Sequence, residues 1–162
     1  MFAAHQMSVG LVLFFRDRHS GMTSAWNREH LFPKSYGVGY DGADTSDLHA
    51  LRPADWRVNS ARNNLYFDWC NDTSVCTSPA HAEAAATTAK DSQRFQPPEA
   101  VRGDIARSLF YMALRYNAEL VDETQEVNTE PLTLGDCPCG ETAELGILST
   151  LLTWHRQDPV RE

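Results

Sequence analysis

Residues 26–35 read WNREHLFPKS, and this stretch decides the fold of the first half of the chain. Its first seven residues favour a short β-strand, which Pro33 ends because proline has no backbone N–H to donate. Glu29 and His30 stand side by side near that end. Neighbouring side chains on a strand point to opposite sides, so both can serve one site only where the strand bends or stops. A carboxylate is a hard ligand for Mg²⁺ or Ca²⁺, and an imidazole, with an unperturbed pKa of about 6.5, can act as a general base.

A second polar segment, residues 47–64, reads DLHALRPADWRVNSARNN and follows a glycine-rich loop. Its beginning, residues 47–51, alternates polar and apolar side chains. This alternation predicts another strand, with Leu48 and either Ala50 or Leu51 facing inward.

The same segment then predicts a helix. Pro53 suits the first helical position, and the paired asparagines at the end of the segment suit the exit. Asn59 and Arg62 are three residues apart and share one helical face, with Arg52 near them in projection. An amide oxygen flanked by guanidinium groups suits a metal-bridged phosphate, because arginine can bind two phosphate oxygens at once.

The second half of the chain is predicted to be mainly helical, which gives an α+β fold. The clearest helix follows two prolines at 97–98, and a last helix ends at Pro159. Residues 71–98 are expected to form a surface excursion with one weak helix over 82–89. The long helix carries an apolar stripe of Val101, Ile105, Leu109, Met112, Tyr116 and Leu120, and the last helix is expected to bury Leu145, Leu148 and Leu152.

Composition places the chain among globular proteins of one domain. It has 162 residues, a mass of 18.2 kDa and 42% hydrophobic side chains. The net charge of -8 argues against a polyanionic partner at first sight. However, residues 116–162 alone carry ten acidic and two basic side chains, whereas the earlier part is balanced. The bulk charge therefore does not exclude nucleic acid.

Neither the apolar runs nor the cysteines fix a compartment. The longest apolar run, residues 9–15, is too short to span a membrane and is followed by charged residues rather than by a cleavage site. We therefore expect a buried strand there and no signal peptide within this chain. The four cysteines, Cys70, Cys76, Cys137 and Cys139, are compatible with disulfides, free thiols or, less well, a metal site.

Several motifs, in order along the chain, resemble the bacterial endonuclease I family, which are secreted or periplasmic nucleases of the β-β-α-metal (His-Me finger) group. The resemblance runs from about Asn27 to the end, with interruptions at 71–94 and 118–143. The matching motifs are Asn27-Arg28-Glu29-His30, Pro33-Lys34-Ser35, Asp47-Leu48-His49, Arg52-Pro53-Ala54, Val58-Asn59-Ser60-Ala61-Arg62, Gly103-Asp104-Ile105-Ala106-Arg107, Phe110-Tyr111-Met112, Trp154-His155 and Asp158-Pro159-Val160.

The resemblance implies a metal-dependent, sequence-nonspecific endonuclease that hydrolyses DNA, with RNA as a second candidate substrate, and leaves 5′-phosphate ends. His30 would be the general base. Glu29 and Asn59 would hold one divalent ion, Mg²⁺ by expectation and Mn²⁺ or Ca²⁺ as alternatives. The phosphate-binding candidates are Arg52, Arg62 and Lys34, and Asp47 and His49 would support the metal site by hydrogen bonds without binding the ion.

The resemblance also implies one domain over residues 1–162, with a β-β-α-metal finger at about 26–64 packed against long helices at about 97–158. It suggests an extracellular or periplasmic protein that binds nucleic acid and no membrane, with a monomer favoured. This chain ends before a helix that family members usually have, and Lys34 is the one cation in residues 31–46. The alternative hypothesis is therefore a truncated or degenerate relative that binds nucleic acid or a partner protein without cutting.

Overall fold

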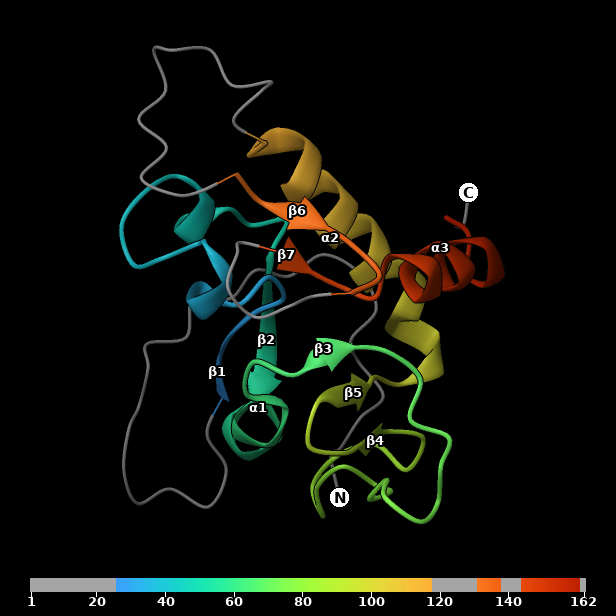
Figure 1. Ribbon diagram of the computed structural model, residues 1–162. Coiled ribbons are helices and arrows are strands. Elements are labelled where there is room, and N and C mark those ends of the chain that lie inside the picture. Colours follow the sequence, from blue (N-terminus) through green and yellow to red (C-terminus); the bar gives the residue numbers. More distant parts are fainter. Residues whose placement is uncertain (1–25, 118–130, 138–143, 161–162) are drawn as a thin grey trace.

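A computed structural model describes residues 26–117, 131–137 and 144–160, and it has the predicted α+β fold (Figure 1). Within these described residues, three small sheets alternate with three α-helices in sequence order. The strand predicted at residues 9–15 and the stripe residue Leu120 lie outside the described residues. Among the described residues, no helix has both the length and the apolar character needed to cross a membrane.

The first unit is a two-stranded antiparallel sheet followed by a helix. Strand β1 (Trp26–His30) pairs with β2 (Leu51–Asp55), so that Glu29 lies opposite Arg52. Two short 3₁₀ helices, η1 (Lys34–Tyr36) and η2 (Asp44–Ser46), lie in the loop between the strands. Helix α1 (Trp56–Arg62) follows β2 at once and packs against both strands.

The second strand begins later than the sequence predicts. Asp47 accepts hydrogen bonds from the backbone N–H of His49 through its side chain (2.8 Å) and of Ala50 through its carbonyl (3.1 Å). These bonds fold residues 47–50 into a turn, because aspartate competes with sheet pairing for backbone donors. The predicted strand at 47–51 is therefore wrong, and Leu48 is exposed instead of facing inward.

The first helix also begins later, at Trp56 instead of Pro53. Asp55 caps it, since its carboxylate accepts from the backbone N–H groups of Arg57 (2.8 Å) and Val58 (3.2 Å). Pro53 belongs to β2, where it pairs with Arg28. A proline is tolerated there because β2 is an edge strand of a two-stranded sheet. One side of it pairs with no other strand, so a missing backbone N–H on that side breaks no hydrogen bond of the sheet.

The excursion after α1 contains a second small sheet and no helix at 82–89. In this sheet β5 (Arg94–Gln96) lies between β3 (Tyr66–Phe67) and β4 (Ala89–Lys90). The Thr88 hydroxyl donates to the carbonyl of Ala85 (2.7 Å) and accepts from the N–H of Ala80 (3.1 Å), which holds this alanine-rich segment in turns.

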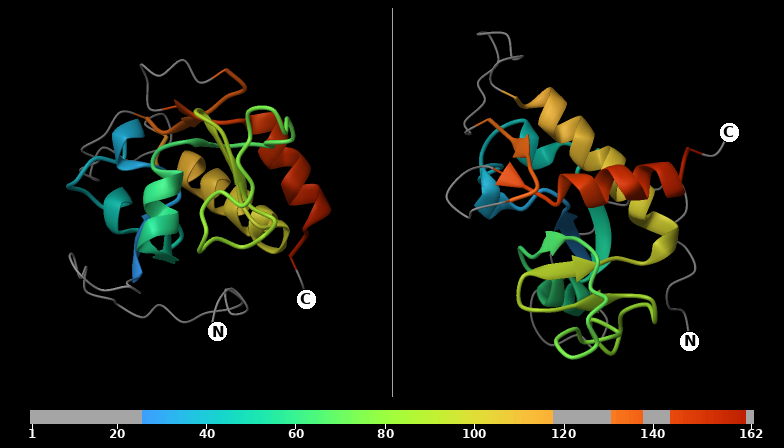
Figure 2. Two further views of the ribbon diagram at one scale, coloured as in Figure 1. Left: turned by 90° about the horizontal axis from the view of Figure 1, so that it is seen from below. Right: turned by 45° about the vertical axis from the view of Figure 1, so that its right-hand side comes forward.

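Helices α2 (Arg102–Arg115) and α3 (Leu148–Gln157) pack together and carry the core (Figure 2). A short 3₁₀ helix, η3 (Glu99–Val101), leads into α2, and β6 (Thr133–Leu134) pairs with β7 (Glu144–Leu145) ahead of α3. The predicted stripe of α2 is buried at Ile105, Leu109, Met112 and Tyr116.

The predicted buried face of the last helix is wrong in phase. Leu152 is exposed, and the buried face consists of Thr150, Leu151 and Trp154. Leu145 is buried, but in β7 and not in the helix. The hydroxyl of Thr150 donates to Asp68 at 2.5 Å, so a polar residue faces inward because a partner is available there.

Candidate active site

A pocket of about 320 Å³ opens where β1 ends against α1. It contains five of the eight predicted site residues, because β1, the loop after it and α1 all contribute to its wall. The wall is formed by Arg28, Glu29, His30, Pro33, Lys34, Ser35, Tyr40, Asn59, Arg62, Asn63 and Asn64. Glu29 and His30 can both line it because β1 stops at His30.

Glu29 and Arg62 form a buried ion pair beneath this pocket. Arg62 Nη1 lies 2.8 Å from Glu29 Oε1, and both residues are less than a tenth exposed. Burial raises the pKa of Glu29 to about 7, although the charge of Arg62 and its contact act in the opposite direction. The second carboxylate oxygen, Oε2, is the atom that could accept a cation without displacing Arg62.

Arg62 is thereby a positioning residue in this structure. Its guanidinium donates to the backbone carbonyls of His30 (3.1 Å) and Leu31 (2.9 Å), and it lies 4.5 Å from the ring centre of Phe67. The planar fork of arginine suits several acceptors at once. These contacts link α1 to the end of β1, and they differ from the phosphate contacts that the sequence suggested for Arg62.

His30 has a defined tautomer. Its Nε2 lies 2.9 Å from the carbonyl oxygen of Thr45 in η2. A carbonyl can only accept, so we assign the proton to Nε2. In the neutral imidazole the lone pair then belongs to Nδ1, which is the atom that can take a proton from water.

Asn59 is oriented by two bonds that both use its amide nitrogen. Nδ2 donates to Asn27 Oδ1 at 2.8 Å and to the carbonyl of Arg28 at 3.4 Å. The amide oxygen takes no part in these bonds, and it is the atom that binds hard cations. Asn59 and Arg62 share a face of α1, as their spacing predicts, and this face meets Asn27 and Glu29 of β1.

Arg52, Asp47 and His49 are located elsewhere. Arg52 donates to Ser108 Oγ on α2 (2.7 Å) and to the carbonyl of Leu51 (2.8 Å), so it ties β2 to the long helix. Arg52, Asp47 and His49, which the sequence predicts as site residues, therefore do not line the pocket.

Asp47 joins the turn before β2 to α2. It accepts from the hydroxyls of Tyr116 (2.8 Å) and Tyr111 (3.1 Å) and from His49 Nδ1 (3.0 Å). Burial acts to raise the pKa of Asp47, but hydrogen bonds from His49, Tyr116 and Tyr111 hold it below its ordinary value. Burial and the Asp47 contact raise the pKa of Tyr116. The ring of His49 stacks on Tyr111 with centroids 4.1 Å apart.

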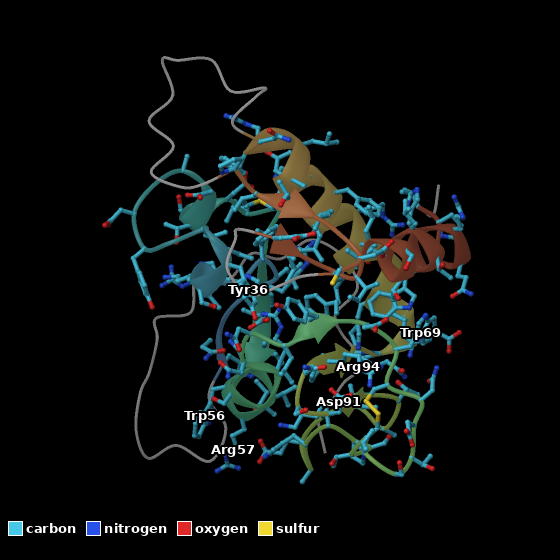
Figure 3. The ribbon with its side chains drawn as sticks, in the orientation of Figure 1. Tyr36, Trp56, Arg57, Trp69, Asp91 and Arg94 are labelled. Carbon is cyan, nitrogen blue, oxygen red and sulfur yellow. A yellow bond between two sulfur atoms is a disulfide. The ribbon has the colours of Figure 1, made fainter. Side chains whose placement is uncertain are left out.

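Sequence reasoning missed Arg28, Tyr40 and Asn63 as pocket residues. Arg28 is part of the matched motif and could have been found there, since it precedes Glu29. Tyr40 lies in the glycine-rich loop and Asn63 follows α1, and neither has a distinctive spacing. Trp56 and Arg57, also outside the predicted site, project from the start of α1 (Figure 3).

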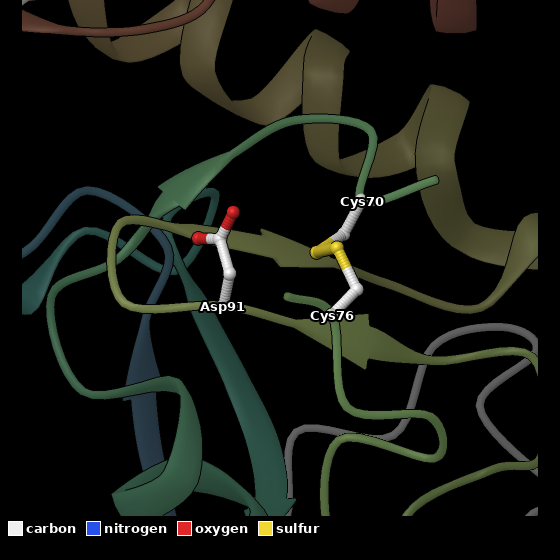
Figure 4. Close-up of side chains that lie close together, drawn as sticks. All are labelled: Cys70, Cys76 and Asp91. Carbon is white, nitrogen blue, oxygen red and sulfur yellow. A yellow bond between two sulfur atoms is a disulfide. The ribbon is translucent and has the colours of Figure 1, made fainter. Parts of the chain in front are cut away.

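Two of the four cysteines, Cys70 and Cys76, form a disulfide, which is one of the alternatives that the sequence leaves open. Cys70, Cys76 and Asp91 lie close together and form a group of possible metal ligands (Figure 4). Within the described ranges, this is the one place where three or more His, Cys, Asp or Glu side chains come close enough to share an ion. The sulfurs are bonded to each other, and thiolates would be needed to bind a metal. Asp91 instead accepts from Arg94 Nε at 2.8 Å.

The donor set of the pocket fits a hard divalent cation. Glu29 and Asn59 offer one carboxylate and one amide oxygen, and the remaining coordination positions would be open to water and substrate. Sulfur and imidazole, which favour zinc or copper, are not needed as ligands here. The chemistry of these residues is therefore compatible with Mg²⁺, Mn²⁺ or Ca²⁺.

Comparison with known proteins gives a consistent set of relatives. The sequence profile of the family described as endonuclease I matches residues 14–162. An extracellular ribonuclease of Bacillus amyloliquefaciens is 37% identical over 146 residues, which is 90% of this chain and 46% of the relative. An extracellular ribonuclease of Bacillus subtilis (strain 168) gives the same values. Endonuclease-1 of Buchnera aphidicola is 31% identical over 99 residues, 57% of this chain and 37% of that protein. The chain thus spans about half the length of the two Bacillus relatives.

Proposed function

The chain belongs to the endonuclease I family, and from this premise we propose that it is a metal-dependent endonuclease that hydrolyses phosphodiester bonds. The observation that carries the proposal is that Glu29, His30 and Asn59 line one pocket together with the cations Arg28 and Lys34. A general base, two hard oxygen ligands and two cations are the groups that phosphodiester hydrolysis requires.

His30 is proposed as the general base. The hydrogen bond from Nε2 to the Thr45 carbonyl orients the ring, and Nδ1 is the nitrogen proposed to take a proton from the attacking water. Since a backbone carbonyl stabilises the N–H that points toward it, the bond also supports the imidazolium that forms after proton transfer.

Glu29 and Asn59 are proposed to hold the divalent ion. The ion would supply positive charge next to the scissile phosphate and the leaving oxygen. Asn27 orients the amide of Asn59, and Arg62 holds Glu29 in place, so the two oxygen donors are positioned before a cation binds. The unit of β1, β2 and α1 would in this way serve as a β-β-α-metal finger.

Arg28 and Lys34 are proposed to bind substrate phosphates in place of Arg52 and Arg62. Both cations line the pocket. Arg52 lies outside the pocket and donates to Ser108, and Arg62 is paired with Glu29. Phosphate and metal contacts carry no base information, which supports cleavage without sequence preference. The 5′-phosphate products are proposed on the family resemblance alone. The relatives named extracellular ribonuclease support RNA as a substrate, and DNA is proposed on the family resemblance.

We further propose that the protein works outside the cytoplasm, in the periplasm or the extracellular medium. The disulfide between Cys70 and Cys76 supports an oxidising compartment, and so do the relatives named extracellular ribonuclease.

The test is degradation of plasmid DNA and of RNA with Mg²⁺, with and without a chelator. His30→Ala should lower the rate about 100- to 10,000-fold, the range for loss of a general base. His155→Ala is a matched control, because His155 is exposed on α3 and lies outside the pocket. Cleavage by His30→Ala at the parental rate would contradict the assigned role.

The same preparations separate this proposal from a relative that binds without cutting. A filter-binding titration of the parent protein with plasmid DNA, run beside the cleavage assay, should show both binding and turnover. Binding without any turnover in Mg²⁺, Mn²⁺ or Ca²⁺ would favour the alternative.

A further inference from the structure

Tyr40 is the most exposed large hydrophobic side chain in the described part of the chain, at 80%, and it lines the candidate active site. Tyrosine side chains in folded proteins are usually at least partly buried, because their rings are apolar. A ring this exposed on the wall of a pocket has room to stack against a flat ligand.

The loop that carries Tyr40 is anchored by the two residues directly before it. Val38 is buried at 1% exposure, and the N–H of Gly39 donates to the carbonyl of Lys34 at 3.0 Å. Gly39 has a φ of 68°, which a residue with a side chain rarely adopts, and its carbonyl accepts from the hydroxyl of Thr45 at 3.3 Å. An anchored loop loses little conformational entropy when a ligand stacks on its ring.

A cation and two amides accompany the ring. Lys34 Nζ lies 4.7 Å from the centre of the Tyr40 ring, so the aromatic group and the phosphate-binding cation form one unit. Asn63 and Asn64 line the same pocket and carry both donors and acceptors, as the edge of a nucleobase does.

Asn63 is held in an unusual backbone conformation. Its φ is 51°, the one positive value at a non-glycine residue among those described. Its N–H donates to the carbonyl of Asn59 at 2.8 Å, and its own carbonyl accepts from Arg62 Nη1 at 3.1 Å. The contacts that orient the proposed metal ligands thus also fix Asn63 at the pocket wall.

We propose that Tyr40, with Asn63 and Asn64, forms a subsite for an unpaired nucleobase, so that the preferred substrate is a single-stranded polynucleotide. The subsite deepens the phosphodiesterase function proposed above and rests on it for the position of the phosphate. A base inside a duplex has both faces covered by its neighbours, and unstacking it costs free energy. A base in a single strand can offer its face to the ring at no such cost.

The test is binding, measured in a chelator so that no strand is cut. The probes are a short fluorescein-labelled oligothymidylate, an abasic strand of the same length and charge, and a hairpin duplex. The parent should bind the oligothymidylate more tightly than either of the others. Tyr40→Ala should weaken oligothymidylate binding by about 5- to 150-fold, the range for one base–aromatic stack, and leave abasic and duplex binding unchanged.

Two further variants keep the result interpretable. Tyr40→Trp should retain the preference, because it keeps an aromatic face, and Leu114→Ala should also retain it, because Leu114 is exposed on α2 and lies outside the pocket. Equal binding of oligothymidylate and abasic strand by the parent, or no binding of either, overturns the subsite. So does an unchanged preference in Tyr40→Ala.

The plasmid and RNA cleavage assay distinguishes failure of the subsite from failure of the nuclease function. A parent that cuts nucleic acid but shows no dependence on Tyr40 refutes the subsite alone. A parent that prefers oligothymidylate through Tyr40 but never cuts refutes the nuclease function and supports the subsite.

Discussion

Replacing Arg62 with methionine should destabilise the protein by about 3–5 kcal/mol, the cost of breaking a buried ion pair by removing one partner. Arg62 is 3% exposed. It is paired with Glu29, donates to the carbonyls of His30 and Leu31, and lies over the ring of Phe67. It therefore joins helix α1 to the end of strand β1 through one side chain.

The magnitude follows from what the variant leaves behind. Methionine fills much of the same space but donates no hydrogen bond. The carboxyl of Glu29 would then stay buried without its arginine partner. With a slope of about 2 kcal/mol per molar urea, the unfolding midpoint should fall by about 1.5–2.5 M. The melting temperature should fall by about 6–20 °C for a chain of this size.

Two comparisons decide between a positioning role and a phosphate-binding role for Arg62. Arg62→Lys keeps the charge but not the planar fork, so it should also be destabilised. Arg57→Met is the matched control, because Arg57 is partly exposed at the start of the same helix and pairs with Glu83 at the surface; it should cost no more than about 1 kcal/mol. A loss below about 1 kcal/mol for Arg62→Met would refute the reasoning. A stable Arg62→Lys with weakened nucleic-acid binding would restore the role that the sequence suggested.

Two further predictions concern stability. Asp47→Asn should cost about 1.5–3 kcal/mol at neutral pH, since the carboxylate accepts from Tyr111, Tyr116 and His49. Because the folded protein holds the pKa of Asp47 below its ordinary value, this stabilisation is present above about pH 4 and is lost as the pH falls through the lower, folded pKa. Urea titrations at decreasing pH should therefore show a flatter acid decline for Asp47→Asn than for the parent or for the exposed control Asp41→Asn, and parallel curves would contradict the assignment. Changing both Cys70 and Cys76 to serine should cost about 2 kcal/mol, because the crosslink closes a loop with a sequence separation of 6. The urea midpoint measures this loss, and an unchanged midpoint would argue against any stabilising crosslink.

The sequence predicted well those features that depend on local patterns. The stripe on α2 has a strict helical spacing, so Ile105, Leu109 and Met112 are buried as expected. The pairing of Asn59 with Arg62 on one face of α1 follows from their spacing of three, and the structure places that face against β1. The strand predicted before Pro33 is present as β1, but it ends at His30, two residues earlier than the sequence predicts.

The features that the sequence missed depend on side chains that bond to the backbone. Asp47 and Asp55 each capture backbone N–H groups, and this sets where the turn ends and where α1 begins. A pattern of apolar residues contains no information on which aspartate will do so. The sequence likewise predicts phosphate binding for both Arg52 and Arg62. The structure shows instead that Arg52 donates to Ser108 on α2 and that Arg62 pairs with Glu29, and neither contact can be read from the sequence pattern.

The net negative charge of the chain is compatible with a phosphate-binding pocket, because the charged side chains are unevenly distributed along the sequence. Inside the pocket the carboxylate of Glu29 is paired with Arg62, and the wall also contains the cations Arg28 and Lys34. The excess of acidic side chains that gives the net charge of -8 lies in residues 116–162, apart in sequence from these groups. Attraction between exposed charges extends over about 10 Å at physiological salt, so the charges that line the pocket act on a phosphate more strongly than the net charge of the chain does. A divalent ion on Glu29 and Asn59 would add positive charge to the same site, and so would strengthen substrate binding beyond what the cations of the pocket wall supply without metal.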